Sequence, residues 1–129
     1  MANSYTIKQL TEVEDSAPKF GYGEIQQARF ATSDLEAEQT GLSHHRLAAG
    51  NRQPFAHRHE NAEEVYVVLA GTGRLKLDDE IVEVGVLDAV RVSPQVTRCF
   101  EAGPDGLEIL AAGPRHEGDG EVIPGWWKD

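Results

Sequence analysis

The sequence predicts a single all-β domain, and three observations lead to this prediction. Glycine and proline are spread along all 129 residues, and short runs rich in Val, Leu, Ile and aromatic residues lie between them. These runs alternate apolar and polar residues with a period of two, which is typical of half-buried strands. No long helical pattern, internal repeat or run of eighteen apolar residues occurs in the sequence. A chain of this length is expected to form one hydrophobic core.

The predicted strands follow one another closely along the chain. They are the runs 42–47, 64–69, 74–77, 81–84, 89–92, 97–100 and 107–111. The connectors 71–73, 78–80, 93–95 and 103–106 hold glycine, proline and aspartate, which favour tight turns. Strands joined so briefly are expected to be antiparallel, and this many strands favour a sandwich or a closed barrel. We expect residues 1–34 to form an arm and edge strands, 35–112 the barrel, and 113–129 a tail.

Composition narrows the class of partner. Twelve basic and 22 acidic residues give a net charge of −10, which argues against nucleic acid and anionic membranes as partners. The single cysteine, Cys99, cannot form an internal disulfide, and the first residues lack the pattern of a signal peptide, so we expect a cytoplasmic protein. Exposed sheet edges and the apolar pair Trp126 and Trp127 favour a homodimer or a tail folded onto the barrel.

Two histidines and one glutamate form the candidate site. His57 and His59 are two residues apart, so both imidazoles leave the same face of an extended segment. The short connection 60–63 is expected to turn the chain into a hairpin, with Glu64 opening the next strand beside His59. Two imidazole nitrogens and one carboxylate are the set that holds a divalent transition metal with open coordination positions.

This segment resembles the first motif of the cupin superfamily, Gly-x5-His-x-His-x3,4-Glu-x6-Gly. With one extra residue before the first histidine, the matching residues are Gly50, His57, His59, Glu64 and Gly71. The spacing to the last glycine favours Glu64 over Glu63, whose side chain would leave the opposite face of the strand. The resemblance covers about residues 35–112 and implies a small jelly-roll barrel with its site in the interior.

The second cupin motif is altered, because Arg98 stands where the family has a fourth, histidine ligand. A guanidinium group carries only hydrogen-bond donors and cannot coordinate a cation. Three arrangements are open for Arg98. It could face a bound metal and hold an anionic ligand, it could pair with Glu64 in a metal-free pocket, or its head group could reach solvent over its apolar stem.

Further residues share faces with this set. Tyr66 lies on the face of Glu64 and Phe100 on that of Arg98, so both are predicted either to contact a ligand or to fill the core. His44 and His45 are adjacent, so one of them faces inward and could supply a further metal ligand. Cys99 is expected opposite Arg98 as a packed apolar residue. The charged stretches 12–19 and 117–121 are predicted to be solvated surface.

The resemblance implies a metal-dependent enzyme in which His57, His59 and Glu64 hold Fe, Mn, Zn or Ni. The implied substrate is a small organic acid or a sugar-like compound that Arg98 would orient. The implied reaction is a dioxygenation, a decarboxylation or an isomerisation. The alternative is a non-catalytic, metal-free cupin that binds or senses a small anionic ligand. The retained trio favours the enzyme, whereas the missing fourth ligand favours the binding protein.

Overall fold

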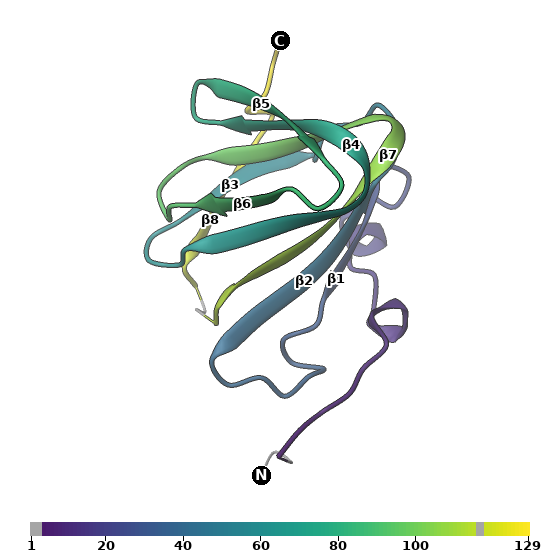
Figure 1. Cartoon of the computed structure of the whole chain (residues 1–129), viewed down its shortest axis with the longest axis vertical. Coiled ribbons are helices and arrows are strands. Elements are labelled where there is room, and N and C mark those ends of the chain that lie inside the picture. The colour runs from purple at the N-terminus through teal and green to yellow at the C-terminus, as the bar shows by residue number, and fades with distance from the viewer. Residues whose placement is uncertain (1–3, 116–117) are drawn as a thin grey trace.

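Antiparallel strands make up almost all of the regular structure in this computed structural model, which describes residues 4–115 and 118–129 (Figure 1). The described elements are the 3-10 helices η1 (Leu10–Glu12) and η2 (Ala17–Phe20) and the strands β1 (Gln26–Phe30), β2 (Thr40–Leu47), β3 (Phe55–His59), β4 (Glu64–Leu77), β5 (Glu80–Gly85), β6 (Ala89–Val92), β7 (Arg98–Pro114) and β8 (Gly120–Pro124). No helix in these ranges is long and apolar enough to cross a membrane.

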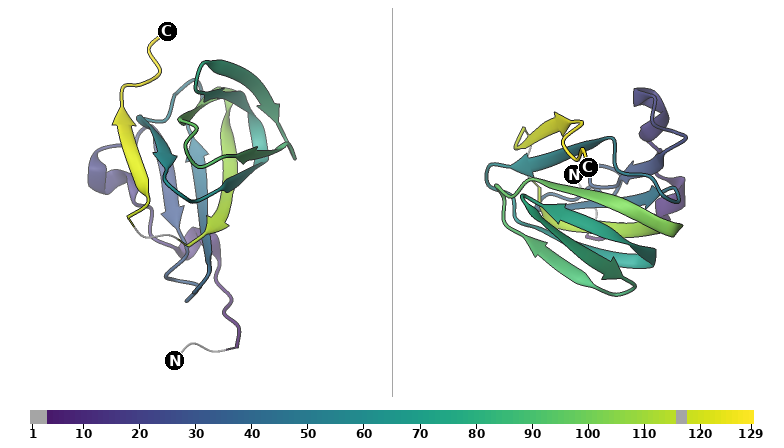
Figure 2. Two further views of the ribbon diagram at one scale, coloured as in Figure 1. Left: turned by 90° about the vertical axis from the view of Figure 1, so that its left-hand side faces the viewer. Right: turned by 90° about the horizontal axis from the view of Figure 1, so that it is seen from above.

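Two long strands, β4 and β7, run through both walls of a curled sheet. The first half of β4 pairs with β6 and with the second half of β7, and β2 and β1 continue this wall. The second half of β4 pairs with β5 and with the first half of β7, and β3 and β8 continue the other wall. Figure 2 shows the resulting half-barrel from two sides. The fold is an all-β jelly roll, as the sequence predicts.

Glycine forms the corners at which β4 and β7 pass from one wall to the other. The sequence predicts turns at 71–73 and 103–106, but both segments lie within continuous strands. Gly71 and Gly106 have positive φ angles of 79° and 82°, and a Cβ atom on Gly71 would clash with the carbonyl group of Gly106. These glycines therefore let two strands bend while their backbones stay in close contact. The prediction of separate strands was wrong here because a strand corner and a turn need the same residues.

The connection between β3 and β4 is also different from the expected hairpin. β3 pairs with β7 and β8, whereas β4 pairs with β5, β6 and β7. Residues 60–63 therefore carry the chain from one wall to the other. The predicted turn at 78–80 does form a hairpin, between β4 and β5. A short connection in this fold thus either closes a hairpin or crosses the barrel, and crossing places β3 and β4 face to face.

Apolar side chains fill the space between the walls and a smaller space beneath the tail. The main core includes Val68, Leu75 and Phe100. The second cluster joins Cys99 to Ala56 and Trp127. β8 pairs with β3, which brings the C-terminal segment onto the body of the protein (Figure 2). Burial raises the pKa of the Cys99 thiol to about 11, so this cysteine is a packed, protonated side chain.

Candidate metal centre

The two histidines of β3 point into the barrel because side chains alternate along the strand. Ala56 faces the cluster beneath the tail, and Arg58 pairs with Glu121 at 2.6 Å on the same outer side. His57 and His59 occupy the other face and line an interior cavity. Their rings are nearly perpendicular, with centroids 5.1 Å apart. The strand period of two thus aims both imidazoles at one place.

Glu64 meets these rings from across the interior. Its Oε1 atom lies 3.1 Å from His57 Nε2 and 3.0 Å from His59 Nε2. Glu63 lies outside the site, 3.2 Å from Arg91. The register of β4 therefore selects the glutamate that the motif spacing favours.

The donor set fits a divalent transition metal. One ligand atom from each of His57, His59 and Glu64 lies within 4.8 Å of the others. In an octahedral site with bonds of about 2.1 Å, neighbouring ligand atoms are about 3.0 Å apart. The separations from Glu64 Oε1 to the two Nε2 atoms match this spacing. Two imidazoles and one carboxylate leave coordination positions open for a substrate.

Arg98 is fully buried, with 0% of its surface exposed, and is bonded to Glu64. Its Nη2 donates to Glu64 Oε1 at 2.9 Å, and its Nε donates to the Tyr66 hydroxyl at 3.1 Å. Its Nη1 donates to two backbone carbonyls, those of Pro94 at 3.0 Å and Val96 at 2.7 Å. The arrangement in which Arg98 reaches solvent is therefore wrong. The guanidinium holds the glutamate and lines no described part of the interior cavity.

Tyr66 completes the contacts of Glu64. Its hydroxyl donates to Glu64 Oε1 at 2.7 Å and lies 3.3 Å from His57 Nε2. Burial and the nearby Glu64 carboxylate raise the pKa of the Tyr66 hydroxyl, so it stays protonated and remains a donor. Phe100 packs against Tyr66 with its ring centroid 5.1 Å away and belongs to the core. Phe100 therefore supports Tyr66 from the core, and it does not line the cavity.

Glu64 is ionised in this setting. Burial alone would raise the pKa of its carboxyl group, but hydrogen bonds from His57, His59 and Tyr66 outweigh burial and hold the pKa well below its usual range. The guanidinium of Arg98 supplies a counter-charge at 2.9 Å. The ionised Glu64 and the protonated Arg98 therefore have no net charge as a pair.

Asp119 belongs to the site, although its charged stretch predicts a solvated surface position. It is only 7% exposed, and its Oδ2 lies 3.3 Å from His59 Nδ1. The same carboxylate accepts hydrogen bonds from the backbone N–H groups of Asn61 at 3.0 Å and Ala62 at 2.9 Å. The contact has an ion-pair distance without hydrogen-bond geometry, since His59 Nδ1 has no hydrogen-bond partner among the described residues. A carboxylate at this place favours one orientation of the ring. No spacing signal in the sequence links residues sixty positions apart; the pairing of β8 with β3 creates this contact.

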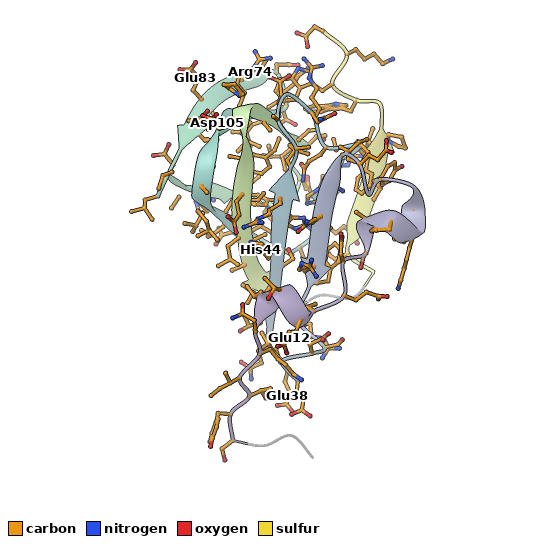
Figure 3. The ribbon with its side chains drawn as sticks, turned by 90° about the vertical axis from the view of Figure 1, so that its right-hand side faces the viewer. Glu12, Glu38, His44, Arg74, Glu83 and Asp105 are labelled. Atoms are coloured by element: carbon orange, nitrogen blue, oxygen red, sulfur yellow. The ribbon has the colours of Figure 1, made fainter. Side chains whose placement is uncertain are left out.

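The side chains of the adjacent His44 and His45 on β2 leave opposite faces of the strand, as their spacing predicts. His45 lines the cavity, and its Nε2 lies 2.9 Å from the Ser43 hydroxyl. Burial, followed by the charges of His57 and His44, lowers the pKa of His45 to about 4, so its ring is neutral. His44, labelled in Figure 3, pairs instead with Glu108 at 2.5 Å. His45 is not among the described groups close enough to share one ion with the trio.

Two cavities meet at the centre. One of them, the aromatic cavity, has a volume of about 350 Å³ and lies between η2, β1, β2, β3 and β8. A second cavity, also of about 350 Å³, extends along β2 to the residues around Thr32 and Arg115. His59 and Glu64 line both cavities, as do Phe30 and Ser43. The three ligand side chains are therefore accessible to small molecules.

A jelly-roll half-barrel with two histidines and a glutamate directed into it defines a class of protein, the cupins. Residues 43–112 match the family model described as "Cupin domain". The chain therefore belongs to the cupin family. A comparison with curated protein sequences finds no match.

Solved structures confirm the fold. A cupin protein from Bacteroides fragilis is 22% identical, with a TM-score of 0.70 over 91% of this chain and 89% of that chain. The polyketide cyclase RemF from Streptomyces resistomycificus is 20% identical, with a TM-score of 0.75 over 100% of this chain and 89% of that one. A variant of oxalate decarboxylase from Bacillus subtilis is 17% identical, with a TM-score of 0.75 over 95% of this chain but 34% of that protein.

Proposed function

We propose that this cupin is a metal-dependent enzyme that acts on a small organic compound. His57, His59 and Glu64 hold the ion, which is Fe, Mn, Zn or Ni by the chemistry of these ligands. The observation that carries the proposal is the convergence of three ligand atoms within 4.8 Å at the wall of an interior cavity. When bound, the metal supplies Lewis acidity and open coordination positions.

The surrounding residues prepare this centre. Arg98 and Tyr66 both bond to Oε1 of Glu64 and so fix the direction of its carboxylate. Asp119 lies behind His59 and restrains the ring. The apolar wall of the aromatic cavity limits water around a bound substrate, which strengthens polar contacts at the reacting end. Dioxygenation, decarboxylation and isomerisation all suit such a centre, and the neighbours named as a cyclase and a decarboxylase share the fold alone.

Metal analysis of protein purified without an affinity tag tests the proposal. We expect close to one transition-metal ion per chain by mass spectrometry, or uptake of one ion from added Zn(II), Mn(II), Fe(II) or Ni(II). The double substitution His57→Ala and His59→Ala should abolish binding. His44→Ala is the matched control, because His44 pairs with Glu108 away from the centre and should leave metal content unchanged. Protein that takes up none of these ions would contradict the proposal.

A second candidate is a metal-free cupin that binds a small ligand without catalysis. The buried pair of Arg98 and Glu64 favours it, because the guanidinium already neutralises the acid. This candidate predicts protein without metal whose thermal midpoint rises when a small organic ligand is added. A stoichiometric metal that is lost in the double variant would exclude it.

A further inference from the structure

The geometry points to a particular class of substrate: an aromatic or alicyclic compound with a single oxygen donor group at one end. The donor end of this compound would lie at the metal centre, and this part of the inference rests on the proposed function. Its ring body would fill the aromatic cavity, and this part rests on the cavity wall alone. Sugars and compounds with a second charged group are excluded, although the resemblance to cupins implies sugar-like substrates as well.

The wall of the aromatic cavity is mostly aromatic and aliphatic. Rings of Phe20, Tyr22, Phe30 and Phe55 line it, together with Val122. Tyr22 and Phe55 lie against each other with centroids 6.0 Å apart. Such a wall contributes to binding by removing the apolar surface of a ligand from water, which favours a body made of hydrocarbon rings.

Few polar groups of the wall lie outside the centre, and some of these are already partnered. Ser43 lies 2.9 Å from His45 Nε2, and Gln53 accepts a hydrogen bond from the backbone N–H of Phe100 at 3.0 Å. The other polar side chains of the wall are Ser16, Tyr22 and Gln26, and the Nδ1 atom of His45 has no partner among the described residues. A sugar carries a hydroxyl on almost every carbon, more than these few groups can pair with, and each one buried without a partner lowers the affinity. The cavity therefore suits a body with few or no hydroxyl groups.

No lysine or arginine lines the aromatic cavity in the described part of the chain. The guanidinium of Arg98 is fully buried and bonded to Glu64, Tyr66 and backbone carbonyls, and Arg115 lines the second cavity. A carboxylate at the centre would meet the metal, but a second one on a ring body in the aromatic cavity would lose its water with no cation to replace it. A ligand of the aromatic cavity thus carries one charged end.

The volume fits a body of one or two rings. A cavity of about 150 Å³ lined by apolar side chains already accommodates benzene. The aromatic cavity measures about 350 Å³ and has His57, His59 and Glu64 on one wall. A single ring with a carboxylate, or two fused rings, fills this space without displacing the strands.

Isothermal titration calorimetry on the Zn(II)-loaded protein tests the inference with ligands that share one carboxylate. Cyclohexanecarboxylate and glucuronate have six-membered rings of the same size and differ in their hydroxyl groups. We expect cyclohexanecarboxylate to bind at least tenfold more tightly than glucuronate, and than acetate. Cyclohexane-1,4-dicarboxylate should bind at least tenfold more weakly than the monoacid. Equal or tighter binding of glucuronate or the diacid overturns the inference.

Wall variants locate the effect. Ala28→Leu narrows the cavity. It should lower the affinity for cyclohexanecarboxylate at least tenfold and leave the affinity for acetate unchanged. Ala48→Leu, at an exposed position outside this cavity, is the matched control. Because Ala28 is buried and its variant could fold poorly, Val122→Asn is added; Val122 is 55% exposed and lines the cavity. We expect Val122→Asn to lower the affinity for cyclohexanecarboxylate about threefold, because it reduces apolar contact. Unchanged affinity in both folded variants contradicts the inference.

Failure of the inference can be told apart from failure of the metal site. In the His57→Ala and His59→Ala variant, the uncharged ring compound cyclohexanol should still bind more tightly than the polyol inositol, because the aromatic part of the wall is unchanged. If metal is absent but this preference remains, the proposed function fails and the cavity's preference stands. If metal binds but no ligand pair is discriminated, the substrate class is wrong and the metal centre stands.

Discussion

The two histidine pairs of this protein have the same composition but different outcomes. His57 and His59 are separated by one residue on β3, and both reach Glu64. His44 and His45 are adjacent on β2, so one pairs with Glu108 and the other lines the cavity. The difference follows from the alternation of side chains along a strand. Spacing, more than the number of histidines, decides whether two imidazoles meet at one carboxylate.

The most direct test of this comparison makes the separated pair, His57 and His59, into an adjacent pair. Arg58→His combined with His59→Arg keeps the composition but turns one imidazole toward Glu121 on the outer side. We expect metal affinity to fall about 1,000-fold or more, beyond the 10–100-fold typical of outer contacts. Competition with a chromophoric chelator measures it. Arg58→Gln alone should have no effect, and retained affinity in the double variant would show that residue 59 is not a ligand.

Removing the cation that holds Glu64 should have the next largest effect. Arg98→Met leaves a buried carboxylate without its counter-charge, so the free energy of unfolding of the metal-free protein should fall by about 3–5 kcal/mol. Urea denaturation measures this change. Arg91→Met is the matched control, since Arg91 pairs with Glu63 at the surface and should cost about 1 kcal/mol or less. Similar losses in the two variants would contradict a special role for Arg98.

Arg98→His tests the opposite change, because it adds a third imidazole to the site. The resemblance to cupins places a histidine ligand at this position, so metal affinity should increase relative to the natural protein. The same chelator competition detects it. Unchanged affinity would mean that an imidazole at position 98 does not reach the ion.

His45 provides a pH test of the adjacent pair. Its pKa is lowered from 6.5 to about 4, mainly by burial. Between these values the unfolded chain binds more protons than the folded protein, so stability is full above pH 6.5 and falls as the pH drops toward 4. The contribution is up to about 3 kcal/mol. Subtracting the stability curve of His45→Gln from that of the natural protein should isolate this slope; parallel curves would refute it.

The smallest expected effect concerns the carboxylate behind His59. Asp119→Asn weakens the restraint on the ring and should reduce metal affinity about 10–100-fold. Glu121→Gln is the control, because Glu121 pairs with the outward-facing Arg58. Equal affinities in the two variants would show that Asp119 supports only the loop at Asn61 and Ala62.

The parts of this molecule that a local rule governs could be predicted from the sequence. Alternation predicts that His57 and His59 share a face, and motif spacing distinguishes Glu64 from Glu63. The glycines at 71 and 106 were misread as turns, since a corner inside a long strand requires the same backbone freedom. Local rules also fail to distinguish a hairpin from a crossing between walls.

Long-range contacts were the least predictable. Asp119 looks like one of several surface acids until β8 pairs with β3 and brings it behind His59. For Arg98, the residue type excludes metal coordination, but three orientations remain open in the sequence. Only the positions of Glu64, Tyr66 and the carbonyl of Val96 select the buried one. Such selections depend on tertiary packing, which has no period in the sequence.

The buried guanidinium also has a consequence for how the proposed metal centre would be loaded. Because Arg98 already pairs with Glu64, the ligand side chains would be in position before an ion arrives. Loading and chelation would then be reversible steps on a prefolded barrel, unlike zinc fingers, in which metal binding and folding are one event.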